Sequence, residues 1–223
     1  MSYPGLKGNL ITSTLAAVLL MTPPAAICAD NALVPPVHNY QQVTAGLCRG
    51  ALPSRAGIDV LAKEGVKTII DLRKHDTIGI KSEGDYARSL GLNYFHIPMG
   101  HCAPKSADVI AFLDIVLNPK FQPVFVHCRQ GADRTGTLVA IYRMLLQDWS
   151  LGDAYREMRE HKFKPWLLGM RRFLCTIAMK KDAFGVDRSS VVLSIQHHRQ
   201  DATVQPDQSD KNELFAHSGL PGS

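Results

Sequence analysis

The sequence has no Cys-x-x-Cys pair, although it contains five cysteines. Their uneven spacing also differs from that of a small scaffold held together by disulfides. We expect Cys48 and Cys175 to be buried free thiols. The chemistry of the remaining cysteines must then be read from their local surroundings.

An arginine-rich block and a basic stripe interleaved with aromatic residues are also absent, so nothing indicates a nucleic-acid partner. Residues 30–184 nevertheless carry 21 Lys and Arg against 15 Asp and Glu, a net charge of +6. This balance favours an anionic substrate.

The first 29 residues contain only one charged side chain, Lys7, followed by a short uncharged, largely apolar stretch. That stretch is too short for a comfortable membrane span. Small residues then lead to Ile-Cys-Ala before Asp30, the pattern of a cleaved secretory signal. We expect residues 1–29, with Cys28, to be removed and the mature protein to be periplasmic or secreted, with no stable membrane span. An uncleaved anchor is the alternative, and a lipoprotein site at Cys28 is less favoured.

Residues 185–223 have few apolar side chains apart from Val191 to Ile195 and show no sustained periodicity. This composition predicts a mostly disordered tail. The chain is therefore expected to form one domain over residues 30–184. We expect that domain to be a monomer.

Strand and helix patterns alternate along residues 30–184. The predicted strands are a short edge strand at 47–50, a buried strand at 66–72, a third at 92–98 and a central one at 123–127. The predicted helices are 55–64, a short one around 86–90 after a polar loop at 73–85, 107–117 with Ser106 as N-cap, 135–147, 151–161 and 166–180. Phe163, Trp166 and Phe173 are expected in the core. This alternation predicts an α/β fold with a largely parallel central sheet flanked by helices, in which ligands bind beyond the carboxyl ends of the strands.

The sequence HCRQGADRTG, His127 to Gly136, stands at such a strand end, directly before a predicted helix. Its glycines permit a tight loop whose N–H groups point inward, and the helix adds its positive end, so the loop is suited to an anion. Cys128 lies at its base, where these dipoles and the charge of Arg134 favour a thiolate. The planar guanidinium of Arg134 can hold two phosphate oxygens. Thr135 could donate its hydroxyl to the sulfur.

This loop resembles that of the cysteine-dependent phosphatases, with His-Cys, five residues, Arg and then Thr-Gly. The upstream segments LCRGALPSRAGIDVLAKEGVKTIIDLR and NYFHIPM are similar to the atypical dual-specificity phosphatases, including exported bacterial members, over roughly Tyr40 to Lys180. No Trp-Pro-Asp sequence of the classical tyrosine phosphatases occurs. The resemblance implies a nucleophile at Cys128 and a phosphate-binding Arg134. It further implies phosphate contacts from Arg129, Gln130, Gly131, Ala132 and Thr135.

The acid that would protonate the leaving group departs from the pattern of these relatives. They have an aspartate on the loop after the IPM strand, where this chain has His101 and Cys102. Asp133, directly before the loop arginine, resembles the acid of myotubularins and of certain secreted bacterial phosphatases. We favour Asp133 over Asp108, which suits the first turn of a helix, and we place His101 third.

The resemblance implies a phosphomonoester hydrolase with a phosphocysteine intermediate and no metal or other cofactor, acting as a protein tyrosine or dual-specificity phosphatase on phosphoproteins. Phosphoinositides are the alternative substrate, and the single extra loop cation, Arg129, fits a singly phosphorylated group better than a polyphosphate. A phosphoprotein-binding pseudophosphatase and a rhodanese-like sulfurtransferase are the rival classes. The intact Cys128 and Arg134 count against the former, and the Arg-Thr-Gly ending counts against the latter.

Overall fold

The computed structural model describes residues 36–184 and 189–193, which contain one five-stranded sheet. The strands are β1 (Gln41–Thr44), β2 (Leu47–Gly50), β3 (Thr68–Asp71), β4 (Asn93–His96) and β5 (Val124–His127). Their order is β1-β2-β5-β3-β4. Only the β1–β2 pair is antiparallel, and the other three pairs are parallel. The predicted α/β class, the largely parallel sheet and the central place of β5 are confirmed.

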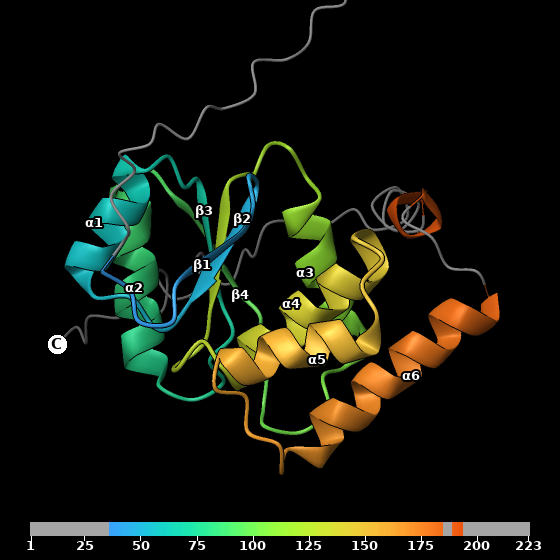
Figure 1. Cartoon of the computed structure of the whole chain (residues 1–223). Helices are drawn as coiled ribbons and strands as arrows, with labels where there is room; N and C mark the ends of the chain where they lie inside the picture. Colours follow the sequence, from blue (N-terminus) through green and yellow to red (C-terminus); the bar gives the residue numbers. More distant parts are fainter. Residues whose placement is uncertain (1–35, 185–188, 194–223) are drawn as a thin grey trace, which may run out of the picture. The chain divides into compact units, whose positions relative to one another are not determined.

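Six helices cover the two faces of this sheet among the described residues. They are α1 (Arg55–Lys63), α2 (Thr77–Ser89), α3 (Ser106–Val116), α4 (Asp133–Leu146), α5 (Leu151–Glu160) and α6 (Leu168–Phe184). Helices α1 and α2 lie on one face, whereas α3 to α6 lie on the other, with α4 in contact with α3, α5 and α6 (Figure 1). The sheet is therefore buried on both sides.

Alternating strand residues supply the two hydrophobic cores. In β3, Ile69 packs with the α1–α2 side, while its neighbour Ile70 packs with the side of α3 to α6. Phe125 and Val126 divide in the same way in β5. Successive side chains of a strand point to opposite faces of the sheet. An uninterrupted apolar run therefore indicates a strand that is buried on both faces. The carboxyl ends of the parallel strands lie side by side, and the loop after β5 begins there.

The edge of the sheet and the start of helix α2 differ from the prediction. Strand β2 has the predicted bounds but is not the edge strand, because β1 pairs with its outer side. The side chains of β1 are partly or fully exposed except that of Val43. Helix α2 begins at Thr77 within the predicted polar loop. The side chain of Asp76 accepts a hydrogen bond from the Gly79 N–H and caps the helix. Gly79 and Gly84 weaken the helical pattern, although Gly84 allows the ring of Tyr94 to approach closely.

Four side chains also correct or confirm expectations about burial. Cys48 is buried and free, and burial raises its thiol pKa to about 12, as suits an unreactive core cysteine. Cys175 is free but exposed, so its predicted burial is wrong. Phe163 is in the core, whereas Trp166 is 70% exposed and lies before the start of α6.

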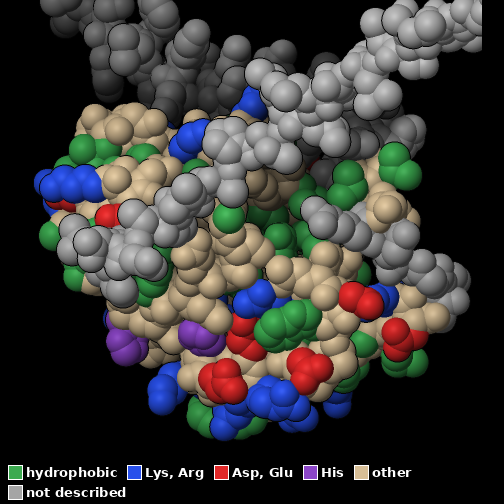
Figure 2. Space-filling model, turned by 45° about the horizontal axis from the view of Figure 1, so that its top comes forward, with side chains coloured by type: hydrophobic (Ala, Val, Ile, Leu, Met, Phe, Trp, Pro, Cys, Tyr) green, Lys and Arg blue, Asp and Glu red, His purple; other side chains and the backbone are tan. Residues whose placement is uncertain are grey.

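The predicted signal sequence lies outside the described residues, as does the predicted tail apart from residues 189–193, which are helical and bury Val191. In the described part of the chain, no helix combines the length and apolarity required to cross a bilayer. Basic, acidic and histidine side chains mix on the face in Figure 2, so the positive charge does not form a single stripe there.

Candidate active site

The five residues between β5 and α4 form a loop that is fixed against β2. Gly131 has a φ of 67°, and a Cβ there would lie 2.4 Å from the carbonyl carbon of Gly50. Only glycine accommodates both the left-handed backbone and this close approach. The fully buried Arg49 donates from Nη2 to the Gly131 carbonyl over 2.6 Å, and the Leu52 N–H donates to the Arg129 carbonyl. The role of Arg49 could not be predicted from the sequence, because only the pairing of β2 with β5 brings it to the loop.

Helix α4 begins directly after this loop, at Asp133. Its N-cap is Ala132, which provides no side-chain hydrogen bond to the first turn. The first N–H groups of a helix lack partners within the helix and carry its positive dipole end. An anion held by the loop would therefore face these donors.

The Cys128 thiol lies at the end of β5 and is 2% exposed. Burial opposes its ionisation, but several neighbours outweigh this effect and lower the pKa below its ordinary value. They are the hydroxyl and N–H of Thr135, the positive charge of Arg134 and the N–H of Gln130. A buried thiol that is nevertheless biased towards the thiolate is suited to nucleophilic attack.

The side chain of Arg134 connects the loop to two other strand ends. Its Nη1 donates to the carbonyl of Leu72 over 3.2 Å and to that of Met99 over 3.4 Å. These carbonyls follow β3 and β4 respectively. The guanidinium is thus held beside Cys128 by the parallel part of the sheet.

A network of buried charges includes His127, the residue directly before Cys128. His127 Nε2 is 2.8 Å from Glu83 Oε1, and Arg73 pairs with both Glu83 and Asp71. Burial lowers the His127 pKa, but Glu83 and Asp71 more than offset this and raise it overall. Asp71, Glu83 and His127 bring potential metal ligands within 4.8 Å of one another. Since Arg73 already binds both carboxylates, we interpret the cluster as an ion-pair network.

Asp133 is joined to the turn between α5 and α6. Its Oδ1 accepts the N–H of Lys164 over 3.0 Å, and its Oδ2 lies 3.2 Å from Lys164 Nζ. The same ammonium group donates to Gln130 Oε1. Asp133 itself is 4% exposed. Loop and turn are therefore fastened together at this point.

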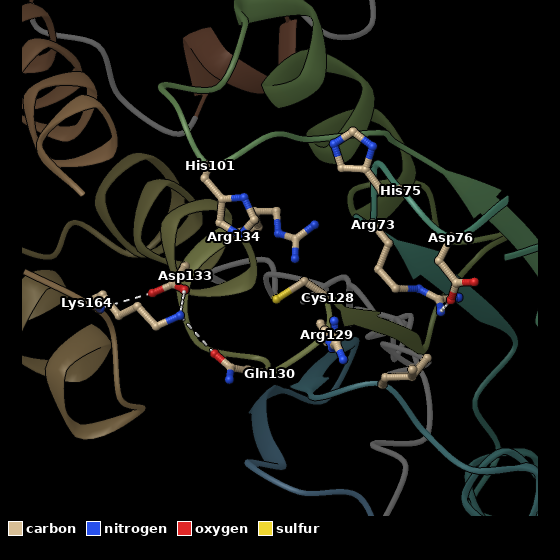
Figure 3. A pocket seen from close by; sticks show the side chains of 11 residues that line it. Arg73, His75, Asp76, His101, Cys128, Arg129, Gln130, Asp133, Arg134 and Lys164 are labelled. Carbon is tan, nitrogen blue, oxygen red and sulfur yellow. Dashed lines mark hydrogen bonds and ion pairs between the residues drawn. The ribbon is translucent and has the colours of Figure 1, made fainter. Parts of the chain in front are cut away.

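The loop opens into a cavity of about 600 Å³, shown in Figure 3. Its walls are formed by Leu52, Arg73, His75, Asp76, His101, Cys128, Arg129, Gln130, Asp133, Arg134 and Lys164. The predicted nucleophile, the arginine and two of the three proposed acids, Asp133 and His101, therefore meet in one place. Asp108 is not among the lining residues, and its carboxylate accepts the Lys105 N–H at the start of α3. The assigned roles themselves remain predictions.

The family that the sequence matches defines the class, a phosphatase domain of the dual-specificity type. Residues 35–167 match the family described as DSP-PTPase phosphatase fused to NAD+ kinase, and the chain belongs to that family. The resemblance stated from the loop and the upstream segments is thereby confirmed.

Similar curated proteins include two phosphatases with different described activities. The chain is 27% identical over 131 residues to the dual specificity protein phosphatase TpbA of Pseudomonas aeruginosa, covering 58% of this chain and 57% of that protein. It is 29% identical over 139 residues to the inositol diphosphatase SIW14 of Saccharomyces cerevisiae, covering 60% and 48%. The chain thus spans only about half the length of these relatives.

Solved structures support the fold. The core catalytic domain of SIW14 in complex with citrate aligns with a TM-score of 0.59 at 22% identity, covering 74% of this chain and 94% of that one. P. aeruginosa TpbA, in a cysteine-to-serine form with phosphotyrosine, aligns with a TM-score of 0.56 at 21% identity and the same coverage.

Proposed function

We propose that the protein is a metal-independent phosphomonoesterase that works through a phosphocysteine intermediate. The observation that carries the proposal is the position of Cys128. Its thiol pKa is lowered at the bottom of a cavity where Arg134 and the open N-terminus of α4 converge. A phosphate group placed there would meet a nucleophile and a set of fixed donors.

The proposed reaction has two steps. The Cys128 thiolate attacks phosphorus, the P–O ester bond breaks, and the leaving oxygen takes a proton from an acid in the cavity. Water then attacks the phosphocysteine, the P–S bond breaks, and the thiolate returns as inorganic phosphate leaves. The proton of that water goes to the group that acted as the acid. Arg134 would bind the phosphate oxygens throughout both steps.

Phosphotyrosine in proteins is the proposed substrate, with some activity on phosphoserine and phosphothreonine. The relative TpbA supports this choice, because it is named a dual specificity protein phosphatase and its structure holds phosphotyrosine. The cavity volume of about 600 Å³ is within the range of sites that enclose a small ligand or side chain.

The test is a panel of phosphopeptides, phosphoinositides and inositol diphosphates assayed for phosphate release with EDTA present. We expect phosphotyrosine peptides to be hydrolysed fastest. Cys128→Ser should abolish turnover and still bind inorganic phosphate, because the donors of the loop persist. Full activity of Cys128→Ser would contradict the mechanism, and sulfur transfer from thiosulfate would support the sulfurtransferase instead.

A phosphorylated inositol or its lipid is the second candidate, favoured by the cations Arg129 and Lys164 on the cavity wall. The relatives named inositol diphosphatases support it as well. Preferential hydrolysis of an inositol compound in the same panel would select this candidate over phosphotyrosine.

We also propose that the protein is exported, on the basis of the signal-like first 29 residues. N-terminal sequencing of the protein recovered from the periplasm or the medium should begin at or near Asp30. Retention of the intact N-terminus in the cytoplasm would contradict export and leave the proposed chemistry unaffected.

A further inference from the structure

The proposed reaction requires a proton donor beside the leaving oxygen, and the cavity contains only a few titratable groups that could act. We propose that this donor is His101, on the segment between β4 and α3. This inference rests on the proposed function and goes beyond it by naming the acid.

Asp133, the acid favoured from the sequence, is occupied by other contacts. One of its oxygens accepts the Lys164 N–H, and the other is paired with the Lys164 ammonium group. A carboxyl group that protonates a substrate needs an oxygen free to carry the proton towards it. Both carboxylate oxygens of Asp133 contact Lys164, so this side chain serves to hold the loop against the α5–α6 turn.

The other carboxylates of the region are committed in a similar way. Asp76 caps α2 by accepting the Gly79 N–H, and its second oxygen pairs with Arg73 over 3.0 Å. Asp108 caps the start of α3 and does not line the cavity. Both groups therefore have structural partners that account for their positions.

His101 lines the cavity and makes no hydrogen bond or ion pair that would occupy its ring within the described residues. In Figure 3 it projects into the cavity on the side of Arg134, whereas His75 lies towards the Arg73 side. Histidine is the side chain most often used to move protons in catalysis, because it takes up and releases a proton near neutral pH.

The segment that carries His101 is held on both sides. Two residues before it, the Met99 carbonyl accepts from Arg134 Nη1, and the Met99 N–H donates to the Leu72 carbonyl. Two residues after it, Ala103 packs against the beginning of α6, where a Cβ on Gly169 would lie 3.0 Å from the Ala103 nitrogen. The absence of a side chain at Gly169 thus lets the segment lie against α6. His101 is positioned by the same arginine that would hold the phosphate.

The proposed step balances its protons. The His101 imidazolium gives one proton to the leaving oxygen as the P–O bond breaks, and the neutral imidazole later takes one from the attacking water. The charged and titratable groups that face it across the cavity are Arg73, His75, Asp76, Cys128, Arg129, Asp133, Arg134 and Lys164. The acid must begin protonated and the Cys128 thiol deprotonated for the first step to occur.

The test compares His101→Gln with wild type on a phosphotyrosine peptide and on an activated aryl phosphate. We expect a loss of about 10²-fold or more on the peptide, the range for removal of a general acid. The loss should be under about fivefold on the activated substrate, whose leaving oxygen hardly needs a proton.

His75→Gln is the matched control, since it removes the other histidine that lines this cavity, on the side of Arg73, and any loss of activity should be the same on both substrates. If His101→Gln retains the wild-type leaving-group dependence, the inference is wrong. If Asp133→Asn shows that dependence instead, the acid is Asp133. Failure of the wild type to release phosphate from either substrate would overturn the proposed function itself, a result distinct from these outcomes.

Discussion

Glu83 Oε1 lies 2.8 Å from His127 Nε2, and both side chains are closed to solvent directly behind Cys128. The histidine that precedes Cys128 is therefore oriented from α2, an element far from it in the sequence.

Replacing Glu83 by Gln should destabilise the protein by about 3–5 kcal/mol, because it breaks a buried charge pair. The His127 pKa is raised in the folded protein, so its proton stabilises the fold fully below about pH 6.5 and this contribution is lost as the pH rises through the raised value. In Glu83→Gln, the loss of folding stability with rising pH should be smaller than in wild type. Urea unfolding measured between about pH 6 and 9 checks both effects.

Asp85→Asn, an exposed substitution on the same helix, is the control and should stay within about 0.5 kcal/mol of wild type. Equal stability of Glu83→Gln and wild type at every pH would show that the pair contributes nothing.

Replacing Arg134 by Lys should remove both turnover and tight binding of inorganic phosphate. A lysine has a point charge without the planar fork that can hold carbonyls on one side and an anion on another. Calorimetric titration with phosphate separates this variant from Cys128→Ser, which should keep its affinity. Phosphate binding by Arg134→Lys equal to that of wild type would refute the assigned role.

Replacing Arg49 by Met should weaken phosphate binding about tenfold or more, although Arg49 does not line the cavity. Its hydrogen bond to the Gly131 carbonyl would be lost, and a buried bond to a charged group contributes about 1.5–3 kcal/mol. Burial lowers the Arg49 pKa to about 10, so the group remains charged at neutral pH. The exposed Arg156→Met should bind phosphate normally, and a similar result for Arg49→Met would rule out support of the loop by Arg49.

Mild peroxide treatment should inactivate the protein reversibly through a disulfide between Cys102 and Cys128. The Cys128 thiolate is oxidised to a sulfenic acid, which the Cys102 thiol attacks with loss of water. Cys102 is a free, exposed thiol next to His101. Cys102→Ser should become irreversibly inactivated, whereas Cys175→Ser, which removes the other exposed thiol of the described residues, should behave as wild type. A peptide map without the linked pair after oxidation would contradict this prediction.

The sequence allowed the loop and its flanking elements to be predicted closely, because their signals are local. The apolar residues of β5, Gly131 and the start of α4 follow one another directly along the chain. The partners of the loop could not be found in this way. Arg49 and Glu83 come from β2 and α2, and only the strand order brings them to the loop.

The misplaced elements have equally particular causes. The start of α2 was missed because its cap, Asp76, adopts a left-handed conformation and its first turns contain weak helix formers. Strand β1 was missed because Val43 is its single buried side chain. Trp166 was expected in the core on the basis of its apolar character, but the helix that would have buried it begins two residues later.

The two carbonyls that Arg134 contacts have a consequence for how an anion would be oriented. Both contacts use Nη1, so in the proposed reaction the other edge of the guanidinium, formed by Nε and Nη2, would bind the phosphate. That edge presents two parallel N–H groups in a rigid plane. The backbone that follows β3 and β4 sets the orientation of this plane. In the proposed reaction, the sheet would therefore determine the angle at which the Cys128 sulfur approaches phosphorus.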